Sequence, residues 1–309
     1  MKKSKCEGVI DDMFLQQLIN GLTVGATYAL VTIGFTLIYS VLELTNFAHT
    51  SFYMLGAYIT MTTVTLIGAT TGNFLLSLLL AMAVCGGIGV FMQRSTLQVI
   101  REKNGAGISA MLCTVGVQTV INNAIILIWS SDSRYFPDIF GNLGKIYLGG
   151  AIISWVQVLI MIAAIVLMAL ISVIIYKTRI GRGMRAIAQN ATAARLMGVN
   201  VNGIIALTFL LSTTVAAIAG TMVGSYYKAI DTNMASSVGF KAFAAAILGG
   251  MGSLPGAVVG GILIGVAETL ISSYLISPGY RDAVAFLILI IVLIIRPRGI
   301  WGQKETSKV

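Results

Sequence analysis

Charged residues are scarce in this chain: Asp, Glu, Lys and Arg make up 10% of its 309 residues, whereas hydrophobic residues make up 57%. A soluble domain carries about 25% charged residues, and these keep its surface hydrated. The shortage excludes an ordinary soluble protein and predicts that lipid surrounds most of the chain. Its length is then taken up by membrane spans of roughly 20 residues and short loops.

Residue types that carry chemistry are scarce as well. His49 is the single histidine, and the three cysteines have neither paired nor metal-ligand spacing. The chain contains no G-x-x-x-x-G-K-S/T loop to hold the phosphates of ATP, and neither a nucleophile–base pair nor paired acids are visible. We therefore expect no catalytic residue, no metal and no cofactor in this chain.

Long uncharged runs are the main feature that is present. Residues 107–130, 153–176 and 204–227 are each 24 residues without a charge. As helices they would be about 36 Å long, enough to cross a bilayer with some tilt. The other predicted spans are two before residue 74 and then, in order, 74–92, 254–275 and about 279–295. We predict an all-α, polytopic transmembrane helical bundle of about eight spans, with broken or re-entrant helices.

The predicted transmembrane domain covers residues 14–295, between an N-terminal tail (1–13) and a C-terminal tail (296–309). Of the 20 basic residues, 12 lie in this last tail and in the loops 93–106 and 177–203. Nucleic-acid binding is the weaker explanation, because these loops lack the signatures of a nucleic-acid-binding fold. The positive-inside rule instead makes these segments cytoplasmic. Counting spans places the N-terminus outside, although its three lysines favour the inside, and a broken or re-entrant segment would reconcile the two.

Polar or glycine-rich residues interrupt the apolar runs at 42–50 and at 246–256. In transporters, half-helices and unwound backbone line a cavity near the middle of the membrane. The alternative is two ordinary loops, one on each side of the membrane. We favour discontinuous helices, and the candidate residues of the translocation pathway are Asn46, Phe47, His49, Gly250, Gly252, Ser253 and Glu268.

Two of these candidates have competing explanations. His49 either makes structural hydrogen bonds beside the first break, contacts the solute, or senses pH. Glu268 lies within a span and should face the interior, because a carboxylate in lipid is costly. It either pairs with a basic group or the backbone, or it is protonated. Close helix packing is predicted by glycines at four-residue intervals, which are Gly252, Gly256 and Gly260 and, on a neighbouring stripe, Gly261 and Gly265.

The cytoplasmic loop 177–203 contains a predicted helix at 184–197, which Gly198 would cap. Its apolar face comprises Met184, Ile187, Ala191, Ala194 and Met197. A short helix between two spans cannot bury such a face alone. It either docks into a groove on a partner protein or rests on lipid headgroups through its arginines. The residues alone leave both possibilities open.

Three stretches of the chain resemble LivH-type permeases, the membrane subunits of branched-chain amino-acid ABC importers. The first stretch comprises residues 181–190 together with Ala193, Leu196 and Gly198. The second extends from 20–22 through 44–49 to 55–58. The third extends from 239–243 through 249–256 to Glu268. They occur in order between about residue 14 and the ending at 296–300. One departure is Thr50, where the family usually has glycine after the histidine.

The resemblance implies a permease in the bacterial cytoplasmic (inner) membrane that works with several partners. These are a second homologous permease subunit, two cytoplasmic ATP-binding subunits and an extracytoplasmic solute-binding protein. The helix in loop 177–203 would be the coupling helix, seated in an ATPase groove. The residues that match its signature are Gly181, Arg182, Arg185, Ala186, Asn190, Ala193, Leu196 and Gly198.

The resulting function is import of branched-chain amino acids or related small polar solutes, driven by ATP hydrolysis in separate subunits. An ion-coupled secondary transporter is the alternative, also built on broken helices. Such a transporter would need acidic residues within the membrane beside the breaks, and Glu268 is the only acidic residue predicted to lie deep in a span. A structural subunit without a pathway would have uninterrupted spans, which the two breaks contradict.

Overall fold

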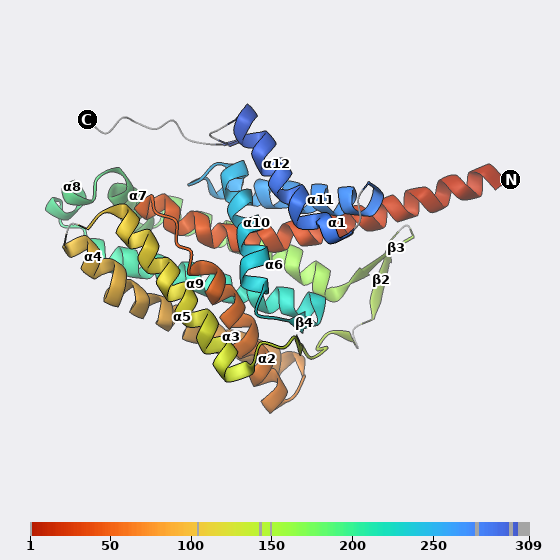
Figure 1. The fold of residues 1–309 in the computed structure, drawn as a ribbon, viewed down its shortest axis with the longest axis horizontal. Coiled ribbons are helices and arrows are strands. Elements are labelled where there is room, and N and C mark those ends of the chain that lie inside the picture. Colours follow the sequence, from red (N-terminus) through yellow and green to blue (C-terminus); the bar gives the residue numbers. More distant parts are fainter. Residues whose placement is uncertain are drawn as a thin grey trace.

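The computed structural model describes residues 2–103, 105–141, 144–148, 150–275, 278–296 and 299–301, with side chains from residue 13 onward except at residues 148 and 278. These residues form a bundle of helices around α1 (Lys2–Leu42) (Figure 1). The other helices are α2 (His49–Ile67), α3 (Thr71–Met92), α4 (Gln98–Glu102), α5 (Gly107–Trp129), α6 (Trp155–Lys177), α7 (Arg179–Gln189), α8 (Ala191–Leu196), α9 (Val201–Tyr227), α10 (Met234–Gly249), α11 (Leu254–Tyr274) and α12 (Arg281–Ile295).

Short irregular elements join some of the helices. A π-helical turn, Gln93–Leu97, links α3 to α4. Two small antiparallel ladders lie in the connections, and their strands are β1 (Arg134–Tyr135), which pairs with β4 (Ala229–Ile230), and β2 (Lys145–Leu148), which pairs with β3 (Ala151–Ser154).

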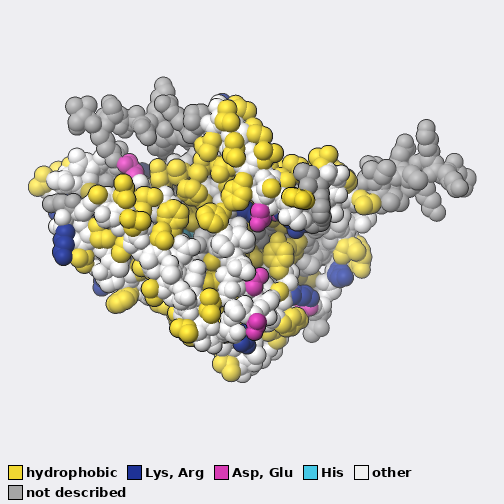
Figure 2. Space-filling model, in the orientation of Figure 1, with side chains coloured by type: hydrophobic (Ala, Val, Ile, Leu, Met, Phe, Trp, Pro, Cys, Tyr) yellow, Lys and Arg dark blue, Asp and Glu magenta, His cyan; other side chains and the backbone are white. Residues whose placement is uncertain are grey.

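Within the described residues, seven helices are long and apolar enough to cross a membrane. They are Met13–Leu42, His49–Ile67, Thr71–Glu102, Gly107–Trp129, Trp155–Lys177, Val201–Tyr227 and Leu254–Tyr274. The apolar helix α12 has 15 residues, about 22 Å at 1.5 Å per residue, and is shorter than the bilayer core of about 30 Å. The predicted all-α transmembrane bundle is confirmed, with seven candidate spans where about eight were predicted, and α12 lies at the position of the span predicted at about 279–295. Figure 2 shows hydrophobic side chains distributed across the visible face, with Lys and Arg in a few small groups.

The N-terminal end of α1 lies beside the β2–β3 hairpin. Gln16 Nε2 donates to the Ile152 carbonyl at 3.2 Å, and the Ile152 N–H donates to Gln16 Oε1 at 2.7 Å. The opposite end of α1 contacts α7, so the helix crosses the whole bundle (Figure 1). Its N-terminus therefore lies at the end of the bundle opposite the basic 177–203 segment. This agrees with the side predicted by counting spans and disagrees with the side that the three N-terminal lysines favour. Helix α1 begins at Lys2, so residues 2–13, which were predicted to form a tail, continue the first span as helix.

The C-terminal tail predicted at 296–309 is described only in part. Residues 297–298 and 302–309 lie outside the described residues.

Glycines let α11 pack closely on two neighbours. An ideal Cβ on Gly265 would lie 2.2 Å from the Gly25 nitrogen of α1, and one on Gly260 would lie 2.2 Å from the Ala245 carbonyl oxygen of α10. Gly261 faces α1 and Gly256 faces α10 in the same way. The predicted close packing is confirmed for these four glycines.

Candidate functional site

The first predicted break follows α1 and is a tightly bonded turn. Glu43 has a positive φ of 53°, which ends the helix. The Asn46 side chain then accepts a hydrogen bond from the Ala48 N–H at 3.1 Å, and the Phe47 N–H donates to Thr114 Oγ1 of α5 at 3.2 Å. These bonds satisfy backbone groups that a helix interruption would otherwise leave without partners inside a membrane.

The second predicted break lies between α10 and α11. Gly250 and Gly252 have φ values of 99° and 91°, a left-handed conformation that favours glycine. Gly252 has open space where a Cβ would lie, so its role is the turn and not helix packing. Ser253 then caps α11, because its Oγ accepts a hydrogen bond from the Gly256 N–H at 3.3 Å.

The chain that follows α12 returns to this second break. The Ile300 N–H donates to the Leu248 carbonyl at 2.8 Å, and the Trp301 N–H donates to the Gly249 carbonyl at 3.1 Å. The last carbonyls of a helix have no partner within the helix. Here the segment that follows α12 supplies hydrogen-bond donors for two of these carbonyls. This capping of α10 was not predicted from the sequence.

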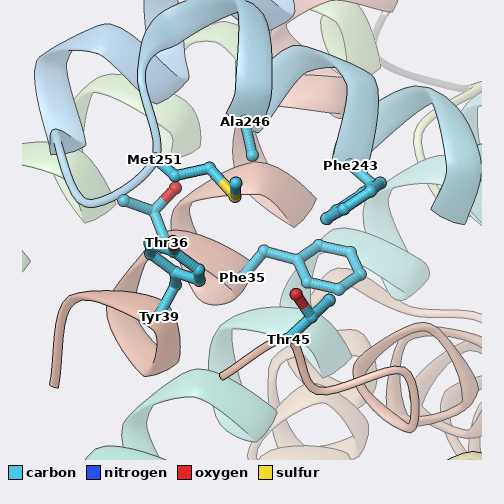
Figure 3. Close-up of a pocket in the computed structure, with 7 residues that line it drawn as sticks. All are labelled: Phe35, Thr36, Tyr39, Thr45, Phe243, Ala246 and Met251. Atoms are coloured by element: carbon cyan, nitrogen blue, oxygen red, sulfur yellow. The ribbon is translucent and has the colours of Figure 1, made fainter. Parts of the chain in front are cut away.

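The two breaks meet at one narrow pocket with a volume of about 10 Å³, room for about one water molecule. Helix α1, both breaks and α10 contribute its lining residues, which are Phe35, Thr36, Tyr39, Thr45, Phe243, Ala246 and Met251 (Figure 3). Three of the seven are aromatic and none is charged. Two independent loops on opposite sides of a membrane would not share a pocket, so the geometry favours the discontinuous-helix interpretation.

None of the predicted pathway residues lines this pocket, although several lie next to lining residues. Gly250, Gly252 and Ser253 flank Met251 in the chain. The Phe47 ring lies 6.4 Å from the ring of Phe243, a lining residue. The lining was missed because α1 reads as a uniform apolar span, in which Thr36 is one of several threonines.

His49 lies at the junction of α1, α2 and α9. Its side chain is fully buried, with Nε2 3.0 Å from the Val31 carbonyl oxygen and Nδ1 3.1 Å from Ser212 Oγ. A carbonyl only accepts hydrogen bonds, so Nε2 carries a proton. The ring fills the space above Gly34, where an added Cβ would lie 2.2 Å from His49 Cε1. These contacts favour the structural explanation for His49, and no group of metal ligands occurs among the described residues.

Glu268 lies apart from the pocket and is paired with a lysine. Its Oε1 is 2.9 Å from Lys241 Nζ, and its Oε2 accepts a hydrogen bond from the Tyr28 hydroxyl at 2.9 Å. Both charged side chains are buried. Of the open possibilities, pairing with a basic group is the one that the geometry supports. The sequence could not single out Lys241, because its partner lies 27 residues away on another helix.

Thr50, the residue that departs from the family pattern, lies in the first turn of α2 with its hydroxyl 3.3 Å from the Phe47 carbonyl oxygen. An ideal Cβ on Gly239 would lie 2.4 Å from the Thr50 methyl carbon, so α10 approaches this threonine closely.

The predicted helix at 184–197 is wrong in its extent. Two helices, α7 and α8, replace it, with Asn190 between them at φ −159° and ψ 106°. The Asn190 side chain accepts hydrogen bonds from the Thr192 and Ala193 N–H groups and so starts α8. The positive φ of 81° at Gly198 agrees with its predicted capping role.

The expectation that this segment cannot bury its apolar face alone is also wrong in part. Met184, Ile187 and Ala194 are buried within this chain. Leu196 and Met197 are instead each 84% exposed. The unburied apolar surface is therefore concentrated at the end of α8.

The residues matched to the coupling signature fall into two groups. Gly181 is buried, and a Cβ there would lie 2.1 Å from the Ile175 carbonyl oxygen, so it allows α7 to pack on the end of α6. Ala186 is half-buried. The exposed members are Arg182, Arg185, Asn190, Ala193, Leu196 and Gly198. Arg185 also donates to the Ile175 carbonyl, and its guanidinium lies 5.9 Å from the centre of the Tyr176 ring.

A helical membrane bundle with two interrupted helices that meet at a pocket defines a membrane transport protein. Residues 17–293 match the family described as branched-chain amino acid transport system / permease component. The chain belongs to this family of permeases.

Individual relatives extend over nearly the whole chain. BraD of Pseudomonas aeruginosa and LivH of Escherichia coli K12, both high-affinity branched-chain amino acid transport system permease proteins, are 37% and 36% identical over 304 residues. Each match covers 96% of this chain and 98% of the relative. Among solved structures, an inward-facing metal-chelate type ABC transporter matches 91% of this chain and 87% of its own, with a TM-score of 0.51 at 14% identity. That similarity concerns the fold alone.

Proposed function

We propose that this chain is the membrane-spanning permease subunit of an ABC importer that carries branched-chain amino acids or related small polar solutes across the bacterial cytoplasmic membrane. The observation that carries the proposal is the full-length match to two permeases of high-affinity branched-chain amino acid transport systems. The partners we infer are a second homologous permease, two ATP-binding subunits and an extracytoplasmic solute-binding protein.

The α7–α8 segment is the part we assign to coupling. Leu196 and Met197 present exposed apolar side chains, and they follow the exposed Arg195 in the chain. Such a surface suits a groove on a partner protein. Helix α7 contacts α1, α6 and α9, and packed interiors transmit displacement because they are stiff. A push on α8 would then reach α1, whose residues Phe35, Thr36 and Tyr39 line the pocket.

The α7–α8 end of the bundle and the C-terminus are assigned to the cytoplasm, from the distribution of basic residues. Cysteine labelling tests this assignment after the native cysteines are replaced. We expect Met197→Cys to react with a membrane-impermeant maleimide only after permeabilisation, whereas Ser131→Cys should react in intact cells. The reverse pattern would contradict the orientation.

Transport by the reconstituted complex tests the function itself. The permease is co-purified with the second permease and the ATP-binding subunits, placed in proteoliposomes and supplied with the binding protein. We expect leucine uptake that requires ATP, and ATP hydrolysis that rises when the leucine-loaded binding protein is added. Uptake that persists without ATP and collapses with a proton or sodium uncoupler would support the ion-coupled alternative instead.

A further inference from the structure

We propose that the π-helical turn Gln93–Leu97 is a conformational switch between α3 and α4. In the conformation seen here, α4 is attached to the first turn of α9. In the other form, the turn is ordinary α-helix and α4 is released. Neither the turn nor Gln93 belongs to the predicted translocation pathway or to the coupling signature. The link between this switch and uptake rests on the proposed function, whereas the switch itself can be tested without transport.

The turn interrupts one long span. Residues Thr71–Glu102 form a continuous helical rod, and within it the Gln98 N–H donates to the carbonyl of Gln93, five residues earlier. The Ser95 hydroxyl donates to the Phe91 carbonyl at 2.8 Å, a side-chain bond of the kind that bends helices. Helices of the π type are rare, occur mostly as single turns inside α-helices and are frequent at functional sites. The turn is therefore a point where this span can change its form.

Gln93 is buried without any hydrogen bond from its side chain. It is 0% exposed, and neither Nε2 nor Oε1 has a partner among the described residues. Gln157 is also buried, but its Oε1 accepts from the Ser154 N–H at 2.8 Å and its Nε2 donates to Asn20 Oδ1 at 3.2 Å. An unsatisfied buried amide destabilises a fold, and native structures contain few of them. A second conformation in which water reaches Gln93 would remove this cost.

Helix α9 binds the rod on both sides of the turn. On the α3 side, an ideal Cβ on Gly89 would lie 2.5 Å from Thr213 Oγ1, so the two helices are in close contact. On the α4 side, Arg101 Nη2 donates to Asn202 Oδ1 at 2.7 Å, and Asn202 Nδ2 donates to Glu102 Oε1 at 3.3 Å. The first contact is packing against backbone, whereas the second consists of side-chain hydrogen bonds that can be broken and re-formed.

The two forms of the turn satisfy different polar groups. Removing the extra residue of the π turn would rotate α4 by about 100° and shift it by about 1.5 Å relative to α3. Arg101 and Glu102 would then no longer meet Asn202, and the withdrawal of α4 would expose Gln93 to water. The attached form has the α4–α9 bonds and an unsatisfied glutamine, and the released form has the reverse. Such a balance allows two discrete packings of similar free energy.

The switch lies next to the segment assigned to coupling. Helix α4 is at the same end of the bundle as α7 and α8 (Figure 1). Asn202 is in the first turn of α9, which begins five residues after α8 ends at Leu196. A displacement of α8 would move the start of α9 and, with it, the group that holds α4. A push from an ATP-binding subunit would therefore favour one form of the turn over the other.

The first test is Gln93→Met, which keeps the size of the side chain and removes its polar groups. Thermal unfolding of the purified permease should shift upward by about 2–4 °C, because a buried unsatisfied amide is lost. Gln157→Met is the matched control and should shift it downward, because it breaks the bonds to Ser154 and Asn20. A downward shift for Gln93→Met would show that this amide is satisfied and would overturn the proposal.

The second test measures the two forms directly. After the native cysteines are replaced, Leu97→Cys is labelled with a maleimide, because Leu97 is 8% exposed in the attached form. Asn202→Ala should raise the labelling rate about fivefold or more, and Gln93→Met should lower it. Arg94→Cys is the control, because Arg94 is exposed at the start of the turn and should label equally in all backgrounds. Equal rates at Leu97→Cys in all backgrounds would overturn the switch.

The last test concerns uptake by the reconstituted complex. Gln93→Met should reduce leucine uptake about fivefold to tenfold, because a more stable attached form makes the released form rarer. A Gln93→Met complex with raised stability and wild-type uptake would overturn the link between the switch and transport. A wild-type complex that hydrolyses ATP but moves no leucine would instead refute the proposed function, and the labelling result would still decide whether the switch exists.

Discussion

Lys241 and Glu268 form an ion pair inside the bundle, with Lys241 Nζ 2.9 Å from Glu268 Oε1 and side chains only 8% and 4% exposed. The same ammonium lies 2.7 Å from Asp282 Oδ1 at the start of α12 and 3.2 Å from the Tyr28 hydroxyl of α1. One lysine of α10 thus contacts α1, α11 and α12. Because α10 carries a wall of the pocket, these bonds fix where that wall lies.

Removing one partner of this pair should destabilise the permease strongly. We expect Lys241→Met to cost about 3–5 kcal/mol, because the Glu268 carboxylate would stay buried without its cation. The double variant Lys241→Met with Glu268→Gln should recover much of the loss. Thermal unfolding of the purified permease in detergent measures both effects.

The matched control is an ion pair near the surface. Lys228 pairs with Asp138, with side chains 49% and 32% exposed. Lys228→Met should change stability by about 0–1 kcal/mol, because water already screens this pair. Equal effects of the two lysine substitutions would show that burial does not determine the strength of the Lys241 pair.

Gly265→Ala should disrupt the packing of α1 on α11. A methyl group there would lie 2.2 Å from the Gly25 nitrogen, a contact that only a backbone shift could relieve. The overlap should cost about 1–3 kcal/mol and reduce the yield of folded permease in size-exclusion chromatography. Gly116→Ala is the control, because nothing lies within 4 Å of its Cβ position, and alanine should gain up to about 1 kcal/mol in helix propensity.

His49→Ala should lower stability and not solute affinity. The ring bonds Val31 and Ser212 and packs on Gly34, so its removal leaves a cavity at the junction of three helices. We expect a loss of about 2–4 kcal/mol, with the KM for uptake unchanged when rates are normalised to folded transporter. A variant of normal thermal stability that has lost transport would instead support direct solute contact.

Acidic residues at the end of α8 should uncouple ATP hydrolysis from transport. Leu196 and Met197 are each 84% exposed, so replacing both with glutamate should leave thermal stability unchanged. Solute-stimulated ATP hydrolysis should fall at least about tenfold, as expected when central contacts of an interface are lost. Leu275→Glu is the control, because Leu275 is 78% exposed but follows α11 at the opposite end of the bundle. Normal coupling in the double variant would argue that this segment rests on lipid.

Features encoded by consecutive residues were predictable from the sequence. The spans follow from uncharged runs, because a hydrocarbon core of fixed thickness requires about 20 apolar residues in a row. The break at Gly250 and Gly252 follows from glycines whose positive φ other residues rarely adopt. Helix in the loop 177–203 was predicted correctly, but the N-cap at Asn190 was overlooked, and one predicted helix became two.

The sequence by itself determined the membrane class, the spans, the two interruptions and the family. The tertiary structure alone decided which polar groups pair and which do not. Tyr28 and Glu268 are 240 residues apart in the chain, yet they share a hydrogen bond because α1 and α11 pack antiparallel through glycines. Thr32 and Thr36 lie one turn apart on α1, yet the Thr32 hydroxyl contacts the Ala242 carbonyl of α10 as well as the Tyr28 carbonyl, whereas the buried Thr36 hydroxyl has no partner among the described residues. Hydrogen bonding and ion pairing depend on distances between helices, and a local pattern does not contain those distances.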